Sequence, residues 1–227
     1  TASVESEALV ELGLKHGIPV LHDVGSGSLL PTERYGLAHE PMPQESVTDG
    51  MGLVFFSGDK LLGGPKAGIV VGHKELVQKL ERHPLARAVR IDKLSLAALT
   101  ATLLHYLADE AEKEIPVWRM ISSTEESIKQ RAEHWLSETG VNGKVEPSRS
   151  AIGGGTLPGE TLPSWVLSLD CQDVSGGAEE VMIRMRQADQ PVVARIEDDR
   201  VLLDPRTVAP NEENDLISVF RQVMEVQ

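Results

Sequence analysis

One lysine in the stretch FFSGDKLLGGPKAG, residues 55–68, has a setting that favours amine chemistry. Lys60 follows an apolar run that contains two aromatic residues, and a Gly-Gly-Pro turn begins three residues later. Burial of a lysine amine favours its neutral, nucleophilic form, which attacks aldehydes to form Schiff bases. The stretch lacks the Gly-x-x-x-x-Gly-Lys-Ser/Thr pattern of a phosphate loop. Two interpretations stay open at this point: a Schiff-base lysine, and an ordinary surface lysine in a turn.

Two polar residues before Lys60 fit a site for pyridoxal 5′-phosphate (PLP). Such a site needs an acid that keeps the pyridine nitrogen protonated, and donors for the phosphate. Asp23 lies near the end of the strand-like run IPVLHDV, and Ser57 precedes Lys60 by three residues. An Asp that caps a loop and a Ser that merely ends a strand are the alternatives. If the two strands are parallel, they bring Asp23 and Lys60 to one edge of a sheet, where α/β enzymes bind ligands.

The elements that must position these residues form an α/β pattern in the first part of the chain. The spacing of apolar residues predicts a helix over 5–16, which Gly17 ends, and a long helix for which Asp92 is the cap. Residues 25–46 are expected to be mostly loop. The other predicted elements are strands at 18–24, 52–58 and 67–73, and helices at 74–82 and 92–108.

The second part of the chain predicts a compact α+β domain. It comprises a helix at 124–138, a strand, glycine loop and strand across 144–170, a helix at 177–188, a hairpin at 191–208 that turns at EDD, and a helix at 211–226. We place the domain boundary near residues 109–116, so the domains are expected to be 1–112 and 113–227. The Gly153–Gly155 loop is a tight turn or a phosphate cradle, and the turn is favoured.

The charge is placed unevenly along the 227 residues. The net charge of −13 argues against a general nucleic-acid binder. Residues 60–93, however, hold five Lys and three Arg against three acids, a balance of +5 that leaves −18 for the rest of the chain. This local excess of positive charge on an acidic protein suggests an anionic ligand, or the edge of a phosphate or tRNA site. A solvated helix face with alternating charges is the other interpretation.

The remaining composition limits the class of protein. The single cysteine, Cys171, excludes an internal disulfide and a cysteine-rich metal site, and it fits the reducing cytosol. Its strand-like setting favours a small core residue over a nucleophile. The chain has no run of 18 apolar residues and no signal-peptide pattern, so we expect a cytoplasmic protein that does not span a membrane. No metal site is expected.

Four stretches together resemble one family of PLP enzymes: FFSGDKLLGGPKAGIVVG, HPLARAVRIDKLSLAAL, GGGTLPGETLPSWVL and ARIEDDRVLLDPRTV. The chain resembles bacterial selenocysteine synthase, L-seryl-tRNA(Sec) selenium transferase, in order over nearly its whole length. The resemblance implies part of an aspartate-aminotransferase-like (fold type I) large domain over 1–112, and a small α+β C-terminal domain over 113–227. Family members are longer, so the chain is expected to be a C-terminal half.

The resemblance also implies an activity. The family uses PLP to convert seryl-tRNA(Sec) to selenocysteinyl-tRNA(Sec) with selenophosphate, and it forms homo-oligomers with sites at subunit interfaces. Two alternatives stay open. One is another fold-type-I PLP enzyme, such as an ammonia-lyase that acts on a small amino acid. The other is a non-catalytic fragment that folds or binds a partner without a cofactor.

Site residues follow from the resemblance, position by position. Lys60 matches the family's PLP lysine, Asp59 matches an acid that assists beside it, and Asp23 matches the acid on the pyridine nitrogen. Arg87 and Arg90 match arginines that hold the selenophosphate-like anion. Being three residues apart, they are expected to share one face of a helix.

One position departs from the family's pattern. Lys66 stands where many relatives are expected to have glutamine. The sequence gives it no role.

Overall fold

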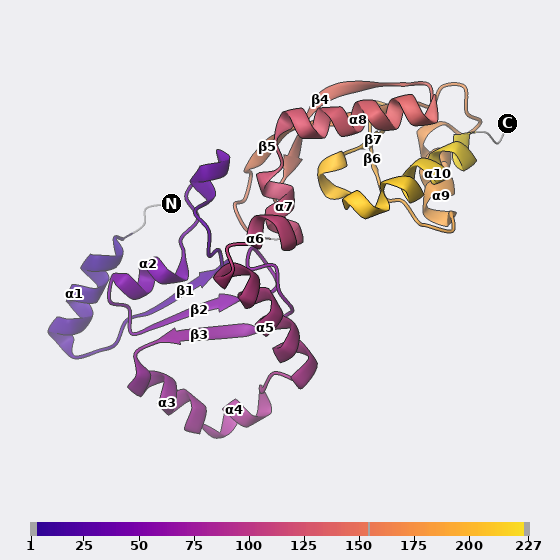
Figure 1. Ribbon diagram of the computed structural model, residues 1–227. Helices are drawn as coiled ribbons and strands as arrows, with labels where there is room; N and C mark the ends of the chain where they lie inside the picture. The colour runs from indigo at the N-terminus through magenta and orange to yellow at the C-terminus, as the bar shows by residue number, and fades with distance from the viewer. Residues whose placement is uncertain (1–3, 154, 225–227) are drawn as a thin grey trace. The chain divides into compact units, whose positions relative to one another are not determined.

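The computed structural model describes residues 4–153 and 155–224, which form two compact units (Figure 1). Unit 1 comprises the described residues of Thr1–Ile121 together with Ile152–Glu160. Unit 2 comprises those of Ser122–Ala151 and Thr161–Gln227. The division falls later in the chain than the boundary expected after residue 112, and segment 152–160 belongs to unit 1.

Unit 1 is built on a three-stranded sheet in the order β1-β2-β3. Strand β1 (Leu21–Gly25) pairs parallel to β2 (Leu53–Ser57), and β2 pairs antiparallel to β3 (Gly68–Gly72). All three strands were predicted. Helix α2 (Pro43–Thr48) packs on β2, and the Nδ1 atom of His22 lies 2.8 Å from Ser46 Oγ, which ties β1 to that helix.

The three longer helices of unit 1 begin and end within one residue of the bounds that the sequence predicted. Helix α1 (Ser6–His16) ends at Gly17, whose left-handed backbone (φ 66°) suits glycine. Helix α3 (Lys74–Arg82) follows β3, and α4 (Pro84–Ala88), which was not predicted, comes after it. Helix α5 (Lys93–Leu107) is capped by Asp92, whose carboxylate accepts from the backbone N–H groups of Leu94 and Ser95.

Several short helices of unit 1 were not predicted. A 3-10 turn, η1 (Thr32–Tyr35), and helix α2 interrupt the segment expected to be loop. Helices α6 (Ala111–Glu114) and α7 (Pro116–Ser122) follow α5. Helices α2 and α7 start at a proline, which fits the first turn of a helix because its missing N–H has no partner there.

Unit 2 is an antiparallel sheet with three helices packed on one another and on its strands. The strand order is β4-β5-β7-β6, from β4 (Gly143–Ala151), β5 (Thr161–Asp170), β7 (Arg200–Leu203) and β6 (Arg195–Glu197). Asp198 and Asp199 have positive φ and form the two-residue hairpin turn, as EDD predicted. The other elements are α8 (Glu125–Thr139), α9 (Gly177–Gln187), η2 (Pro205–Thr207), η3 (Pro210–Glu212) and α10 (Glu213–Met224).

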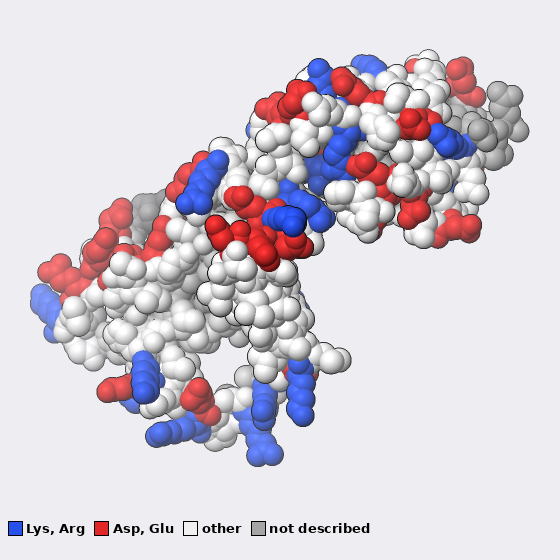
Figure 2. Space-filling model, in the orientation of Figure 1, with Lys and Arg blue, Asp and Glu red and all other residues white. Residues whose placement is uncertain are grey.

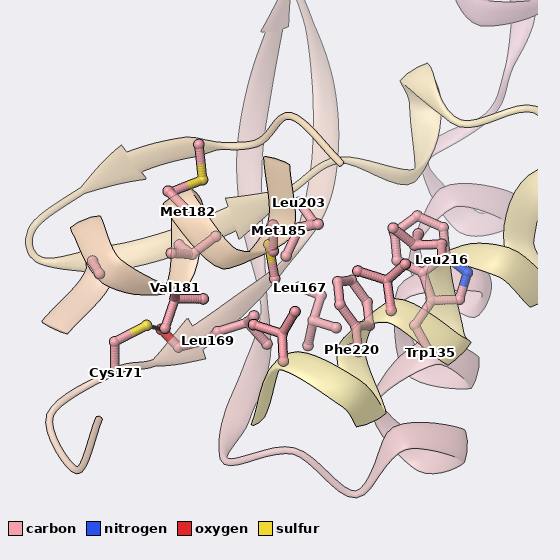
Figure 3. Packing of buried hydrophobic residues seen from close by; sticks show 14 of the residues in the cluster. Trp135, Leu167, Leu169, Cys171, Val181, Met182, Met185, Leu203, Leu216 and Phe220 are labelled. Atoms are coloured by element: carbon pink, nitrogen blue, oxygen red, sulfur yellow. Dashed lines mark hydrogen bonds between the residues drawn. The ribbon is translucent and has the colours of Figure 1, made fainter. Parts of the chain in front are cut away.

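The core of unit 2 lies between the sheet and these helices (Figure 3). Leu167 and Leu169 of β5 point toward Phe220 of α10 and Met185 of α9, and all four are completely buried. Cys171 lies at the edge of this cluster and is 1% exposed. The interpretation of Cys171 as a core residue fits this burial.

Three further sequence expectations concern the described residues. The backbone N–H of Thr156 donates to Gly153 O at 3.3 Å, which is the bond of a tight turn, although residue 154 of the Gly153–Gly155 loop lies outside the described residues. None of the helices in residues 4–153 and 155–224 combines the length and the hydropathy that a bilayer-spanning helix needs. In those same residues no group of three His, Cys, Asp or Glu is arranged to hold a metal ion.

Candidate functional site

The ends of β1 and β2 form the candidate site. In the parallel pair Asp23 lies opposite Phe55, and the register shifts between Asp23 and Gly25. Because parallel strands run in the same direction, the segments after β1 and after β2 leave the sheet at one edge. Lys60 lies in the segment after β2. The parallel pairing on which the sequence hypothesis depended is therefore present.

The ends of the Lys60 and Asp23 side chains converge above Gly25. A Cβ placed on Gly25 would lie 3.9 Å from Lys60 Nζ and 4.0 Å from Asp23 Oδ1. Gly25 has φ 74°, so both its conformation and the space above it suit glycine. Lys60 is half-buried and Asp23 is exposed. Within the described residues neither side chain has a hydrogen-bond or ion-pair partner, so both are available to a ligand.

The Lys60 loop is joined to the glycine-rich loop that follows β1. The backbone N–H of Leu61 donates to Ser26 O at 3.0 Å. A Cβ on Gly27 would lie only 2.4 Å from Ser57 O, so the two backbones approach as closely as glycine allows. Ser57 is half-buried at the end of β2. The three residues predicted to hold PLP thus come from the ends of two paired strands and from the loop after β2, which binds the loop after β1.

Asp59 and Lys66 form an ion pair across the Lys60 loop. Lys66 Nζ lies 3.3 Å from Asp59 Oδ2, and the Lys66 side chain is 92% exposed. Exposed pairs of this kind contribute little to stability. The sequence had offered no role for Lys66, and the structure shows that it pairs with Asp59.

The expectation that Arg87 and Arg90 share one face of a helix is wrong. Arg87 lies in α4, but that helix ends at Ala88 and Arg90 follows it in irregular backbone. The reason is the next helix: Asp92 adopts an extended conformation as the cap of α5, so the chain must leave α4 first. Both arginines are exposed.

A run of unpaired cations surrounds these arginines, and we call it the basic segment. It consists of six exposed side chains, none of which forms an ion pair with any described residue. Of the three acids between them, Asp92 is committed to the cap of α5. Figure 2 shows blue side chains gathered where Figure 1 places α3, α4 and the start of α5. The members are Lys74, Lys79, Arg82, Arg87, Arg90 and Lys93.

Sequence reasoning missed two residues beside the Lys60 loop. Tyr106 of α5 donates a hydrogen bond to the carbonyl of Leu62, and Trp118 of α7 donates to Tyr106. Only their rarity could have singled them out, since the chain has two Tyr and three Trp.

The residues present fit PLP. An amine and a carboxylate face one point beside a glycine that leaves the space open, and a serine hydroxyl lies at the end of the adjoining strand. Lys60 can hold the cofactor covalently, Asp23 can pair with a protonated ring nitrogen, and Ser57 can donate to a phosphate.

Comparison with known proteins decides the family. The family model described as L-seryl-tRNA selenium transferase matches residues 1–209. The chain belongs to this family. The L-seryl-tRNA(Sec) selenium transferase of Moorella thermoacetica is 44% identical over 232 aligned residues, covering 99% of this chain and 49% of the relative. That of Alkaliphilus oremlandii is 41% identical, with the same coverage. The chain thus spans about half the length of the curated relatives it matches.

The family assignment confirms the resemblance stated from the sequence, and the fold agrees with it. The solved structure of D-glucosaminate-6-phosphate ammonia-lyase covers 98% of this chain with a TM-score of 0.59, at 18% identity. At that identity the likeness shows the fold alone. The predicted fold class is confirmed: α/β, part of a fold-type-I PLP large domain followed by a small α+β domain. The family is one of PLP-dependent transferases, as predicted.

Proposed function

We propose that this chain forms the lysine-bearing part of a PLP-dependent enzyme that converts seryl-tRNA(Sec) to selenocysteinyl-tRNA(Sec) with selenophosphate. One observation carries the proposal: Lys60 Nζ and Asp23 Oδ1 converge above Gly25 in a chain of the L-seryl-tRNA selenium transferase family. When bound, PLP supplies an electron sink for reactions at the α-carbon of an amino acid.

The chain's own residues have separate tasks in this proposal. The Lys60 amine holds the cofactor and, once released, can take the α-proton of the seryl group. The Asp23 carboxylate holds a proton on the ring nitrogen, and the Ser57 hydroxyl donates to the phosphate. The role of Asp59 as an assisting acid stays a prediction. Asp59 directly precedes Lys60 in the sequence, and its carboxylate pairs with Lys66.

Arg87 and Arg90 supply the positive charge that an anionic selenium donor needs. Guanidinium groups match phosphate oxygens with two parallel hydrogen bonds. Both arginines are exposed and have no ion-pair partner among the described residues, so no internal carboxylate competes with a ligand. Their separation by the end of α4 lets them approach an anion from different directions.

A homo-oligomer and a cytoplasmic location stay predictions. The ammonia-lyase alternative also keeps one observation in its favour, the fold shared with D-glucosaminate-6-phosphate ammonia-lyase. The shared fold does not choose between the reactions, whereas the family match covers residues 1–209 and favours the selenium transferase.

An activity assay separates the three hypotheses. The protein is loaded with PLP and given seryl-tRNA(Sec) and selenophosphate, and selenocysteinyl-tRNA is measured beside Lys60→Ala. Product that depends on Lys60 supports the proposal. Ammonia released from a free amino acid, without selenocysteinyl-tRNA, favours the lyase. No product from either substrate favours a non-catalytic fragment.

A further inference from the structure

The loop that carries Lys60 is held from behind by a chain of two hydrogen bonds. The Trp118 Nε1–H donates to Tyr106 Oη at 2.6 Å. The Tyr106 hydroxyl lies 2.9 Å from Leu62 O and 3.3 Å from Leu61 O, and it donates to this pair of carbonyls. Leu61 and Leu62 are the two residues directly after Lys60. The chain therefore runs from α7, through α5, to the backbone beside the candidate catalytic amine.

The same helices close the space behind the loop. Trp118 is completely buried, and Leu61 and Leu62 are 1% and 0% exposed. Gly63 has φ 74°, and a Cβ there would lie 2.3 Å from Ile115 Cγ2. Any other residue at Gly63 would push the loop away from this support. The segment KEIPVW, residues 113–118, thus contributes two of the contacts, through Ile115 and Trp118.

The hydrogen bonds of the loop itself complete the support. Leu61 N donates to Ser26 O at 3.0 Å, Gly63 N to Lys60 O at 2.9 Å, and Gly64 N to Gly58 O at 2.8 Å. The loop is therefore fixed on one side to the glycine-rich loop after β1, and on the other to Tyr106. Burial raises the pKa of Tyr106, so its hydroxyl stays protonated and remains a donor at neutral pH.

We propose that Tyr106, oriented by Trp118, is a positioning residue that holds the Lys60 backbone in place while the Lys60 side chain reacts. The proposal rests on the proposed function for the identity of the reaction, but the loop contact can be tested without it. A lysine that must bind a cofactor and later move a proton needs a flexible side chain on a fixed backbone. Small displacements of a reacting group lower rates steeply, by about 100-fold for 1 Å.

Tyr35 supplies a matched control. It is the only other tyrosine in the chain, and its ring also packs on Trp118, with centroids 5.7 Å apart. Its hydroxyl donates instead to Glu112 and does not contact the Lys60 loop. Tyr35→Phe and Tyr106→Phe each remove one hydroxyl from the surroundings of the same tryptophan, and only the second removes a bond to the loop.

The test compares these two variants by amide hydrogen exchange and by the rate at which added PLP becomes linked to Lys60. Tyr106→Phe should speed exchange at the Leu61, Gly63 and Gly64 amides about tenfold and slow PLP linkage by a similar factor. Exchange in β2 should stay unchanged, and Tyr35→Phe should alter neither reading. If Tyr106→Phe sped amide exchange equally in the loop and in β2, the variant would be destabilised as a whole and the proposal would be overturned. Identical exchange and PLP linkage in Tyr106→Phe and Tyr35→Phe would also overturn it.

The test still decides if the chain does not link PLP or if Tyr106→Phe does not fold. If the unmodified chain never links PLP, the proposed function fails, and the loop amides still decide whether Tyr106 positions Lys60. If Tyr106→Phe does not fold, Trp118→Phe carries the test. That variant removes the donor that orients Tyr106, so the loop amides should exchange about threefold faster. Unchanged loop amides in Trp118→Phe would then overturn the proposal.

Discussion

The two units use their positive charges in different ways. In unit 2, Arg131, Arg184 and Arg200 each pair with a carboxylate of the same unit. In unit 1, the six cations of the basic segment pair with none of the described residues. These three arginines of unit 2 are bound within its fold, whereas the cations of the basic segment are available to a ligand. The contrast supports the proposal that the candidate site lies in unit 1.

Carboxylates show the same contrast, and the largest predicted effect follows from it. Asp23 of unit 1 has no partner among the described residues, whereas Asp170 of unit 2 pairs with Arg200 Nη1 at 3.4 Å. Asp23→Ala should lower the turnover of the PLP-loaded protein by about 100-fold, because it removes the charge proposed to act on the ring nitrogen. Asp170→Ala should leave the turnover unchanged. Equal losses in the two variants would remove the distinction between the units.

A substitution in unit 2, by contrast, should lower stability. Arg131 pairs with Glu213 and also donates to Pro205 O at 2.7 Å and Val208 O at 2.8 Å. Arg131→Met leaves these acceptors without their donor, so the free energy of unfolding of unit 2 should fall by about 2–4 kcal/mol.

Urea titration followed by labelling of Cys171, which is buried in the core of unit 2, measures this change. Burial raises the pKa of the Cys171 thiol, so the folded protein should react slowly at pH 8 and unfolding should expose the thiol. The control is Arg221→Met, which removes a half-exposed pair with Glu138 and should cost less than about 1 kcal/mol. A loss as large for Arg221 as for Arg131 would contradict the account.

Anion binding sharpens the comparison between the two sets of arginines. Arg87→Gln and Arg90→Gln should each weaken the binding of inorganic phosphate about tenfold, because each removes a charge-assisted donor. Arg186→Gln removes an exposed arginine of unit 2 and should have no effect. Isothermal titration at two salt concentrations measures the change, and the wild-type affinity should fall as salt rises. Unchanged affinity in both unit 1 variants would exclude them from the anion site.

The smallest predicted effect is a shift in one titration. The hydrogen bond that His39 donates to the Glu33 carboxylate raises the pKa of His39, and the charges of Glu45 and Glu33 also favour the charged imidazole. The pair therefore stabilises its loop at low pH, and this contribution is lost as the pH rises through the raised pKa. Titration followed by NMR should place His39 above the ordinary histidine value, and Glu33→Gln should lower it. An unchanged midpoint would show that the pair does not form.

Much of the fold could be predicted because its signals are local. Helix α3 has the bounds that the apolar spacing predicted, Gly17 ends α1, and two aspartates with positive φ turn the β6–β7 hairpin. Each of these depends on neighbours within a few residues. The candidate PLP residues could be named for the same reason, since an acid near the end of one predicted strand and a lysine after the next form a recognisable pattern.

What could not be predicted depends on contacts between distant segments. The bond from Tyr106 to Leu62 joins residues 44 positions apart, and no periodicity marks it. Arg90 lies outside a helix because Asp92 is committed to the next one, so that a capping requirement overrides the spacing of two arginines. Segment 152–160 belongs to unit 1 although it lies between two strands of unit 2.

Covalent capture of PLP on Lys60 tests the central claim most directly. The purified chain is mixed with PLP, reduced with borohydride, digested and mapped by mass spectrometry, beside Lys60→Ala and the exposed control Lys15→Ala. The account predicts one modified peptide, carrying the cofactor on Lys60, that is lost in Lys60→Ala and kept in Lys15→Ala. Modification spread over several exposed lysines, with the same total in Lys60→Ala, would contradict the claim that Lys60 forms the cofactor site.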